Sequence, residues 1–304
     1  MNENKHTYPG FLLWRLQHLL SLLSVVLLLA AAGCWKEDLP GGKQLKLSFH
    51  SASQTGSDAI HEIELFVFDD RQQLISCATC TIDETISLDC PQTSTLHCIA
   101  WGNSNDNSLK LPVLQPGDPL DGAYLTLTPL SSAKDGTQYL NTPPNLFRGA
   151  IETDNNATTR RPSFNMEMQP VTASIHITIS GLLKATGTTD GNYTVEVSRS
   201  AARIDFEGIP GGTAIHRLTG SFNPQKEYII PPFRIFPPPE GKGIKIAVFH
   251  NGTLLKNITQ TSDRQPLVPE AGKELKLQIV FSDNGDAEVR PPGWNSSDID
   301  VVYK

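Results

Sequence analysis

Apolar and polar residues alternate with a period of two in many short segments of the chain beyond residue 44. In residues 45–49 the odd positions are apolar, and residues 174–179 show the same alternation. Because successive side chains of a β-strand point to opposite faces of the sheet, this pattern predicts strands with one buried face. Further short strands are predicted on the same grounds at 86–90, 96–100, 124–127, 193–197, 204–206, 244–248 and 275–281, and apolar runs predict strands at 63–68 and 228–230.

No segment beyond residue 33 carries a sustained helical period, and 23 Gly and 22 Pro residues interrupt the chain often. Many short strands between such breaks are typical of antiparallel β-sandwiches. A polar stretch from Glu152 to Pro162 separates two groups of predicted strands. The sequence therefore predicts an all-β protein with two tandem antiparallel β-sandwich domains, over residues 44–160 and 161–304.

The first 33 residues have the pattern of a secretory signal peptide. Lys5, His6 and Arg15 make a basic start, an uncharged apolar run follows over residues 19–33, and the run ends in small residues. A transmembrane anchor is the alternative, but a spanning helix needs about 20 apolar residues and this run is shorter. We therefore expect residues 1–33 to be removed on export.

Cys34 follows the small residues directly, and Ala31-Ala32-Gly33-Cys34 resembles the lipobox of bacterial lipoproteins. In that pattern Leu is preferred where this chain has Ala31. The resemblance implies that the Cys34 thiol is acylated and becomes the mature N-terminus. Several acyl chains on one residue give stable attachment to a membrane, where a single chain is marginal. Residues 34–43 are then a lipidated tether.

Lys36, Glu37 and Asp38 lie just behind the predicted lipidation site. A Lys followed by two acids at this place resembles the surface-export signal of some bacterial outer-membrane lipoproteins. The alternative is a solvated charged tether with no signalling role. The first interpretation places the protein on the outer leaflet of the outer membrane, facing the medium.

Four of the five cysteines, Cys77, Cys80, Cys90 and Cys98, lie close together in the sequence. In an exported protein such a set favours structural disulfides, and the sequence leaves their pairing open. Cys77 and Cys80 have a C-x2-C spacing, but Cys90 and Cys98 lack the matching spacing of a zinc site. A redox C-x-x-C is less favoured, because no thioredoxin-like βαβ pattern surrounds it.

The remaining chemistry argues against an enzyme. The chain contains no nucleophile-elbow motif, no spaced metal-ligand set and no Gly-rich loop before a helix, so no catalytic residue, cofactor or metal is predicted. A net charge of −7 and the lack of a basic run exclude nucleic acid as an expected partner. Trp101 and Trp294 could stack on sugars, although buried aromatics are more common.

The order of several short motifs resembles the FimB-type fimbrial anchor lipoproteins, the fimbrillin-A-associated anchor proteins. After the lipobox and tether, these motifs are residues 45–49, 63–69, 99–103, 146–149 and 170–182, together with closing strands after residue 267. Many members also carry a Cys soon after the lipidated one, and this tether has none.

The resemblance implies two transthyretin-like β-sandwich domains and no enzymatic activity. It implies an outer-membrane lipoprotein that anchors fimbriae to the cell surface and helps to limit their length. The expected partners are fimbrial, fimbrillin-like subunits, bound by strand exchange, and membrane lipid through acylated Cys34. The alternative function is that of a glycan-binding surface lipoprotein.

Overall fold

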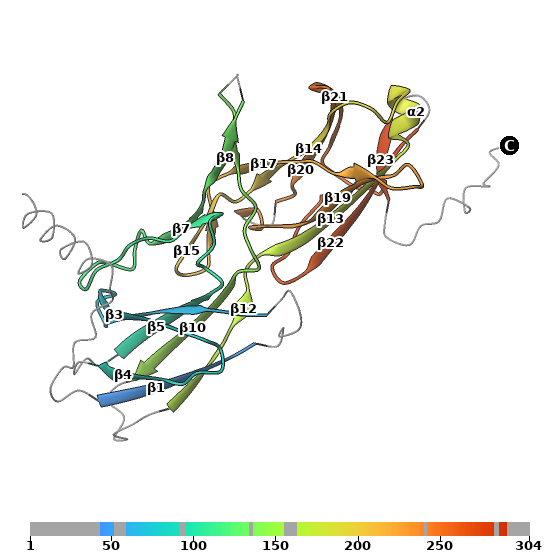
Figure 1. The fold of residues 1–304 in the computed structure, drawn as a ribbon. Helices are drawn as coiled ribbons and strands as arrows, with labels where there is room; N and C mark the ends of the chain where they lie inside the picture. The colour runs from blue at the N-terminus through green and yellow to red at the C-terminus, as the bar shows by residue number, and fades with distance from the viewer. Residues whose placement is uncertain are drawn as a thin grey trace, which may run out of the picture. The chain divides into compact units, whose positions relative to one another are not determined.

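A computed structural model describes residues 43–51, 59–90, 95–133, 136–154, 163–239, 242–282 and 286–290. Strands dominate these residues (Figure 1), so the prediction of an all-β sandwich fold is confirmed. A helix, α2 (Leu182–Thr186), follows Gly181, whose φ of 80° is readily adopted by glycine. The described residues contain no helix that is long and apolar enough to cross a membrane.

Two sheets form the N-terminal sandwich. A three-stranded sheet has the order β11-β1-β4, and a five-stranded sheet has the order β12-β10-β5-β2-β3. Leu45, Leu47 and Val67 are among the apolar residues buried between them. The strands are β1 (Lys43–His50), β2 (Ile63–Phe68), β3 (Leu74–Cys80), β4 (Ile86–Cys90), β5 (Thr95–Gly102), β10 (Phe147–Asp154), β11 (Ser163–Glu167) and β12 (Gln169–Pro170).

The five-stranded sheet is buried on its second face as well. Phe66 and Trp101 on that face join a cluster with Leu125 and Phe206. Leu125 lies in a small sheet with the order β16-β15-β7-β6, and Phe206 directly follows β15 of that sheet. A separate β8–β9 hairpin follows β7 along the chain. The strands are β6 (Leu109–Lys110), β7 (Tyr124–Leu127), β8 (Pro129–Ser132), β9 (Gln138–Leu140), β15 (Arg203–Asp205) and β16 (Pro210–Gly211).

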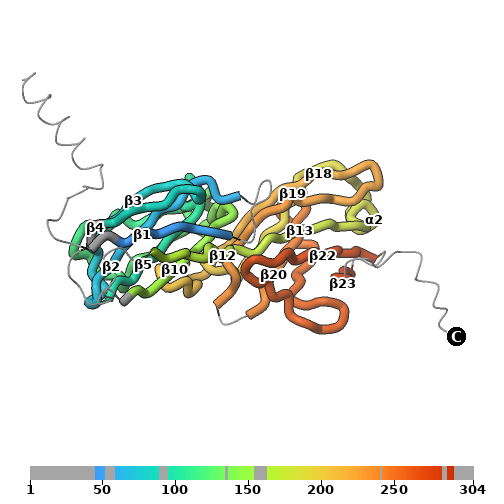
Figure 2. The backbone as a smooth tube through the Cα atoms, turned by 90° about the horizontal axis from the view of Figure 1, so that it is seen from below, coloured from blue at the N-terminus to red at the C-terminus, as the bar shows by residue number. Residues whose placement is uncertain are grey.

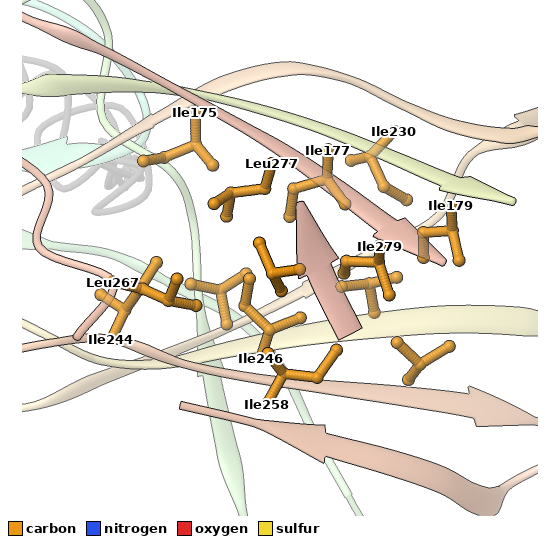
Figure 3. Close-up of a cluster of buried hydrophobic side chains, with 14 of the residues drawn as sticks. Ile175, Ile177, Ile179, Ile230, Ile244, Ile246, Ile258, Leu267, Leu277 and Ile279 are labelled. Carbon is orange, nitrogen blue, oxygen red and sulfur yellow. The ribbon is translucent and has the colours of Figure 1, made fainter. Parts of the chain in front are cut away.

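The C-terminal sandwich packs a sheet β18-β19-β13-β22-β23 against a sheet β17-β14-β20-β21. Isoleucines fill much of the space between them (Figure 3), including Ile175, Ile177, Ile246 and Ile279. The strands are β13 (Ala173–Ser180), β14 (Tyr193–Ser200), β17 (Ala214–Leu218), β18 (Ser221–Phe222), β19 (Tyr228–Ile235), β20 (Lys245–His250), β21 (Thr253–Ile258), β22 (Glu274–Phe281) and β23 (Ala287–Arg290).

The sheets are mixed rather than wholly antiparallel, which corrects one part of the prediction. β1 pairs with β11 in parallel, and β13 pairs with β22 in parallel. Both pairs join segments that are far apart in the sequence. Alternation of apolar residues reports which face of a strand is buried, but it contains no information on the direction of the neighbouring strand.

The strand pairing also differs from the predicted division at residue 160. β11 and β12 lie beyond that residue, yet they pair with β1 and β10 of the N-terminal sandwich. β15 pairs with β7 and so returns from the second half of the chain to the first. A polar stretch marks a loop, whereas sheet membership is decided by the backbone hydrogen bonds. The strands change from one sandwich to the other after Pro170 (Figure 2).

Candidate functional site

The predicted lipidation site and export signal lie outside the described residues; they are Cys34, Lys36, Glu37 and Asp38. Lipidation and surface export therefore stay predictions. The candidate residues within the described part are the cysteines, a fully buried Trp101, a buried histidine, and the outer strands of the sheets.

Among the cysteines, Cys77 is disulfide-bonded, and Cys80 is a buried free cysteine. The prediction that Cys80 takes part in a disulfide is therefore wrong. Cys98 lies in β5, and β2 separates β5 from β3. Two strand spacings amount to about 9–10 Å, beyond the roughly 7 Å that Cα atoms of a disulfide can span. Neither cysteine of β3 can reach Cys98, and the Cys90 side chain lies outside the described part.

The C-x2-C pair does not act as a unit. Residues three apart on one strand point to opposite faces of its sheet, so Cys77 and Cys80 cannot share a ligand. Burial and the nearby Glu84 raise the pKa of the Cys80 thiol to about 11, which keeps it protonated and unreactive. In the described part of the chain, no three His, Cys, Asp or Glu side chains are placed to hold a metal ion.

Trp101 is not a stacking platform for sugars. Its side chain is 0% exposed, and its ring centroid lies 5.8 Å from that of Phe206. Phe206 also makes an edge contact with Phe66 at 4.9 Å. The aromatic group fills the core between the five-stranded sheet and β15, and Trp294 lies outside the described residues.

His216 and Ser200 form a buried pair in the C-terminal sandwich. The Nε2 atom of His216 lies 3.0 Å from Ser200 Oγ, and Nδ1 lies 3.1 Å from the carbonyl oxygen of Leu140. Because a carbonyl only accepts, Nδ1 donates and Nε2 accepts from the hydroxyl. Burial lowers the pKa of His216 to about 4. Both side chains are 0% exposed, so the pair supports the fold and cannot reach a substrate.

A second polar cluster fastens the β8–β9 hairpin to the sheet of β14 and β17. The hydroxyl of Tyr139 donates to Glu196 Oε1 at 2.8 Å, and Arg217 donates to the same oxygen at 2.6 Å. The guanidinium of Arg217 also lies 3.9 Å from the centroid of the Tyr139 ring. Through these contacts, Tyr139 in the first half of the chain is bound to Glu196 and Arg217 in the second half.

The short motifs of the family resemblance have structural roles. Arg148 Nε donates to the carbonyl of Phe206 at 2.8 Å, which ties β10 to β15. A Cβ atom at Gly149 would lie 2.6 Å from the sulfur of Met168, so the methionines of this core would have to shift to admit a larger residue. Asn103 donates to the carbonyls of Ala59 and Asn145 and so joins two loops.

The outer strands of the sheets are the remaining candidates for function, since strand exchange needs an open edge. Most of them are short or contain a charge or a proline. β12 contains Pro170, β19 contains Pro231 and Pro232 beside the two-residue β18, and β21 contains Lys256. Such residues weaken pairing with an added strand.

The family of fimbrillin-A associated anchor proteins Mfa1 and Mfa2 matches residues 36–300 of this chain. This chain belongs to that family. The match covers both sandwiches and begins just behind the predicted lipidation site. The resemblance drawn from the order of the short motifs is therefore confirmed.

Several relatives carry names that refer to fimbriae. The major fimbrium anchoring subunit FimB of Porphyromonas gingivalis is 24% identical over 280 residues, which cover 85% of this chain and 89% of FimB. The fimbrial anchor protein Mfa2 of Porphyromonas gingivalis has a similar fold, with a TM-score of 0.57 and 12% identity over 83% of this chain and 98% of Mfa2.

A structure from Bacteroides ovatus, described as a candidate adhesin, has a TM-score of 0.61 and 14% identity over 87% of this chain and 97% of its own. At these identities the likeness to solved structures establishes the fold alone.

Proposed function

We propose that this protein is the anchoring subunit of a surface fimbria and that its role is structural. The observation that carries the proposal is the family match over residues 36–300, together with a relative named as a fimbrium anchoring subunit over 89% of that relative's length. The all-β structure supports it, because its sheets offer edges to which another strand can be added.

The attachment to the membrane is the first finer part of the proposal. Residues 1–33 are removed, Cys34 is acylated, and residues 34–43 form the tether to β1. The Lys36-Glu37-Asp38 segment directs the lipoprotein to the outer leaflet of the outer membrane. β1 begins only a few residues after Cys34 in the sequence. Even when fully extended, a tether of this length spans about 30 Å between the lipid and the start of β1.

The attachment to the fimbria is the second finer part. A fimbrial subunit pairs with this protein by strand exchange, and a fixed base limits the length of the fibre.

We also propose two β-sandwich domains, with β11 and β12 assigned to the N-terminal one. Trp101 gives the glycan-binding alternative no support, because its side chain is buried.

The test is deletion of the gene and its replacement by a Cys34→Ser variant. Both strains should release fimbriae into the medium, and the variant should also release this protein, because its lipid is lost. Electron microscopy measures fibre attachment and length, and immunoblots of medium and membrane fractions locate the protein. A Trp35→Ala strain, altered beside the lipidation site, is the matched control and should keep both on the cell.

Fimbriae that stay attached and normal in length after deletion would refute the anchoring role. A Cys34→Ser protein that stays in the membrane fraction would refute lipid attachment alone, because the uncleaved 19–33 segment would then be the anchor.

A further inference from the structure

The outer edge of β3 differs from the other sheet edges. β3 is the last strand of the five-stranded sheet, and no described strand pairs with its outer side. Its seven residues contain neither a charge nor a proline. The loop between β6 and β7 pairs with the start of the strand, since the amide of Leu74 donates to the carbonyl of Asp118 and the amide of Gly117 donates to the carbonyl of Leu74, both at 2.8 Å. Among the described residues, no segment other than β2 makes a backbone hydrogen bond to residues 75–80.

The outer strands of the other four sheets with three or more strands, and β12 of the same sheet, lack this combination of length and neutrality. Each contains a charged residue or a proline, or has only two residues: β4 has Asp89, β11 has Glu167, β12 has Pro170, β17 has Arg217, β21 has Lys256, β23 has Glu288 and Arg290, and β18 is Ser221–Phe222. In the sheet β16-β15-β7-β6, the outer strands β6 and β16 have two residues each and contain Lys110 and Pro210. Natural proteins protect sheet edges in these ways, so an unprotected edge of this length is a site for an incoming strand.

Charge surrounds the neutral edge at both ends. Asp69, Asp70 and Arg71 lie in the turn before β3, where Asp118 also contacts the strand. Asp83 and Glu84 lie in the turn after it and are exposed. Glu84 is close enough to Cys80 to contribute to the rise in that thiol's pKa. Each end therefore has a net negative charge, and the space between them is about 20 Å at the rise of a strand.

We propose that the outer edge of β3, from Ile75 to Cys80, is the surface that receives a strand of the fimbrial subunit. The incoming strand is extended and uncharged over about six residues and has a basic residue at each end. Its backbone pairs with β3, and its basic residues meet the acidic turns. This inference rests on the proposed function and names the edge that performs it.

The disulfide at Cys77 fits this role. It cross-links the middle of β3 to another cysteine and so limits the motion of the open strand before binding. A restrained edge loses less conformational entropy when it accepts a partner.

The first experiment locates the bound strand on the full mature chain. The probe is the fimbrial shaft subunit purified from the same strain. Hydrogen–deuterium exchange should slow on binding at about every second amide of residues 75–80, because alternate N–H groups of an edge strand point outward. Thr79→Lys, which places a charge on the exposed end of the edge, should weaken binding at least tenfold. Ser163→Lys on β11 is the matched control and should change binding less than twofold.

The second experiment tests the acidic turns. Asp83→Lys should weaken binding at least threefold and reduce its sensitivity to salt, because a charge at the rim of an interface mainly governs salt-dependent association. Asp263→Lys makes the same charge change at an exposed turn after β21 and should have no effect. If Thr79→Lys fails to fold, Asp83→Lys and the exchange pattern of the unchanged chain decide the question.

Subunit binding with no protection in residues 75–80, and with unchanged affinity in both β3 variants, would overturn this inference and leave the anchoring role standing. Two results together would overturn both the anchoring role and this inference. The subunit would fail to bind the unchanged chain, and fimbriae would stay attached after deletion of the gene.

Discussion

At the residue scale, buried polar and small residues decide more of this structure than surface charges do. His216 makes two hydrogen bonds with 0% exposure, and Gly149 provides the space that two methionines fill. By contrast, the ion pairs of Lys273 with Glu270 and of Lys276 with Glu274 lie at exposed positions, where they contribute little to stability.

His216 should make the protein less stable in mild acid. Its folded pKa of about 4 lies below the ordinary 6.5, so the unfolded chain takes up a proton first as the pH falls. The free energy of unfolding should therefore fall between pH 6.5 and 4, by about 2 kcal/mol from pH 7.5 to pH 5 through this residue. No further loss from His216 is expected below pH 4.

Urea unfolding at the two pH values measures this loss. His216→Gln should remove about 2 kcal/mol of the pH dependence, whereas His61→Gln, at an exposed position, should leave it unchanged. An unchanged pH dependence in His216→Gln would contradict the assignment of a neutral buried imidazole.

At the element scale, the β8–β9 hairpin shows how a weak element is stabilised. All four residues of β8 are exposed, and an isolated two-stranded hairpin is marginally stable in water. The hairpin is held by contacts of β9: Tyr139 bonds to Glu196, and the carbonyl of Leu140 accepts from His216. Its position depends on side chains that lie far away in the sequence.

Tyr139→Phe should loosen this hairpin. The variant keeps the ring beside Arg217 but loses the hydroxyl bond to a carboxylate, which should cost about 1–2 kcal/mol. Amides of residues 129–140 should exchange faster with deuterium, while those of β13 should not. Tyr124→Phe is the control, because Arg203 likewise lies over its ring, at 4.2 Å. Equal exchange in the Tyr139→Phe and unchanged hairpins would show that the hydroxyl does not hold the element.

At the scale of the whole molecule, Leu39–Lys304 forms one compact unit despite its two sandwiches. The reason is the second face of the five-stranded sheet, which packs on strands from both halves of the sequence. Phe206, Ala214 and Phe236 come from beyond residue 200 and lie in the same cluster as Phe68 and Trp101. Both sandwiches therefore share a core.

Phe206→Ala should destabilise the whole unit rather than one sandwich. Removing a fully buried Phe should cost about 3–5 kcal/mol. Thermal unfolding should stay a single transition at a lower temperature, with β5 and β13 losing exchange protection together. Leu254→Ala, at a position 45% exposed, is the control and should change little. Two separate transitions in the unchanged protein would refute the shared core.

Much of this protein could be predicted from local pattern. Alternation located β1, β13, β20 and β22, and the order of short motifs indicated the family before any strand pairing was known. Such features depend on the residues themselves and on their immediate neighbours. A strand with one buried face has the same apolar period wherever it lies.

Pairing between distant segments was decided only by the tertiary structure. The parallel pairing of β1 with β11, the return of β15 to β7 and the free thiol of Cys80 all depend on which backbone lies next to which. The open edge of β3 belongs to the same class, because an edge exists only where no other strand has paired. Sequence period determines a strand's faces, whereas its two edges are determined by the hydrogen bonds of the whole sheet.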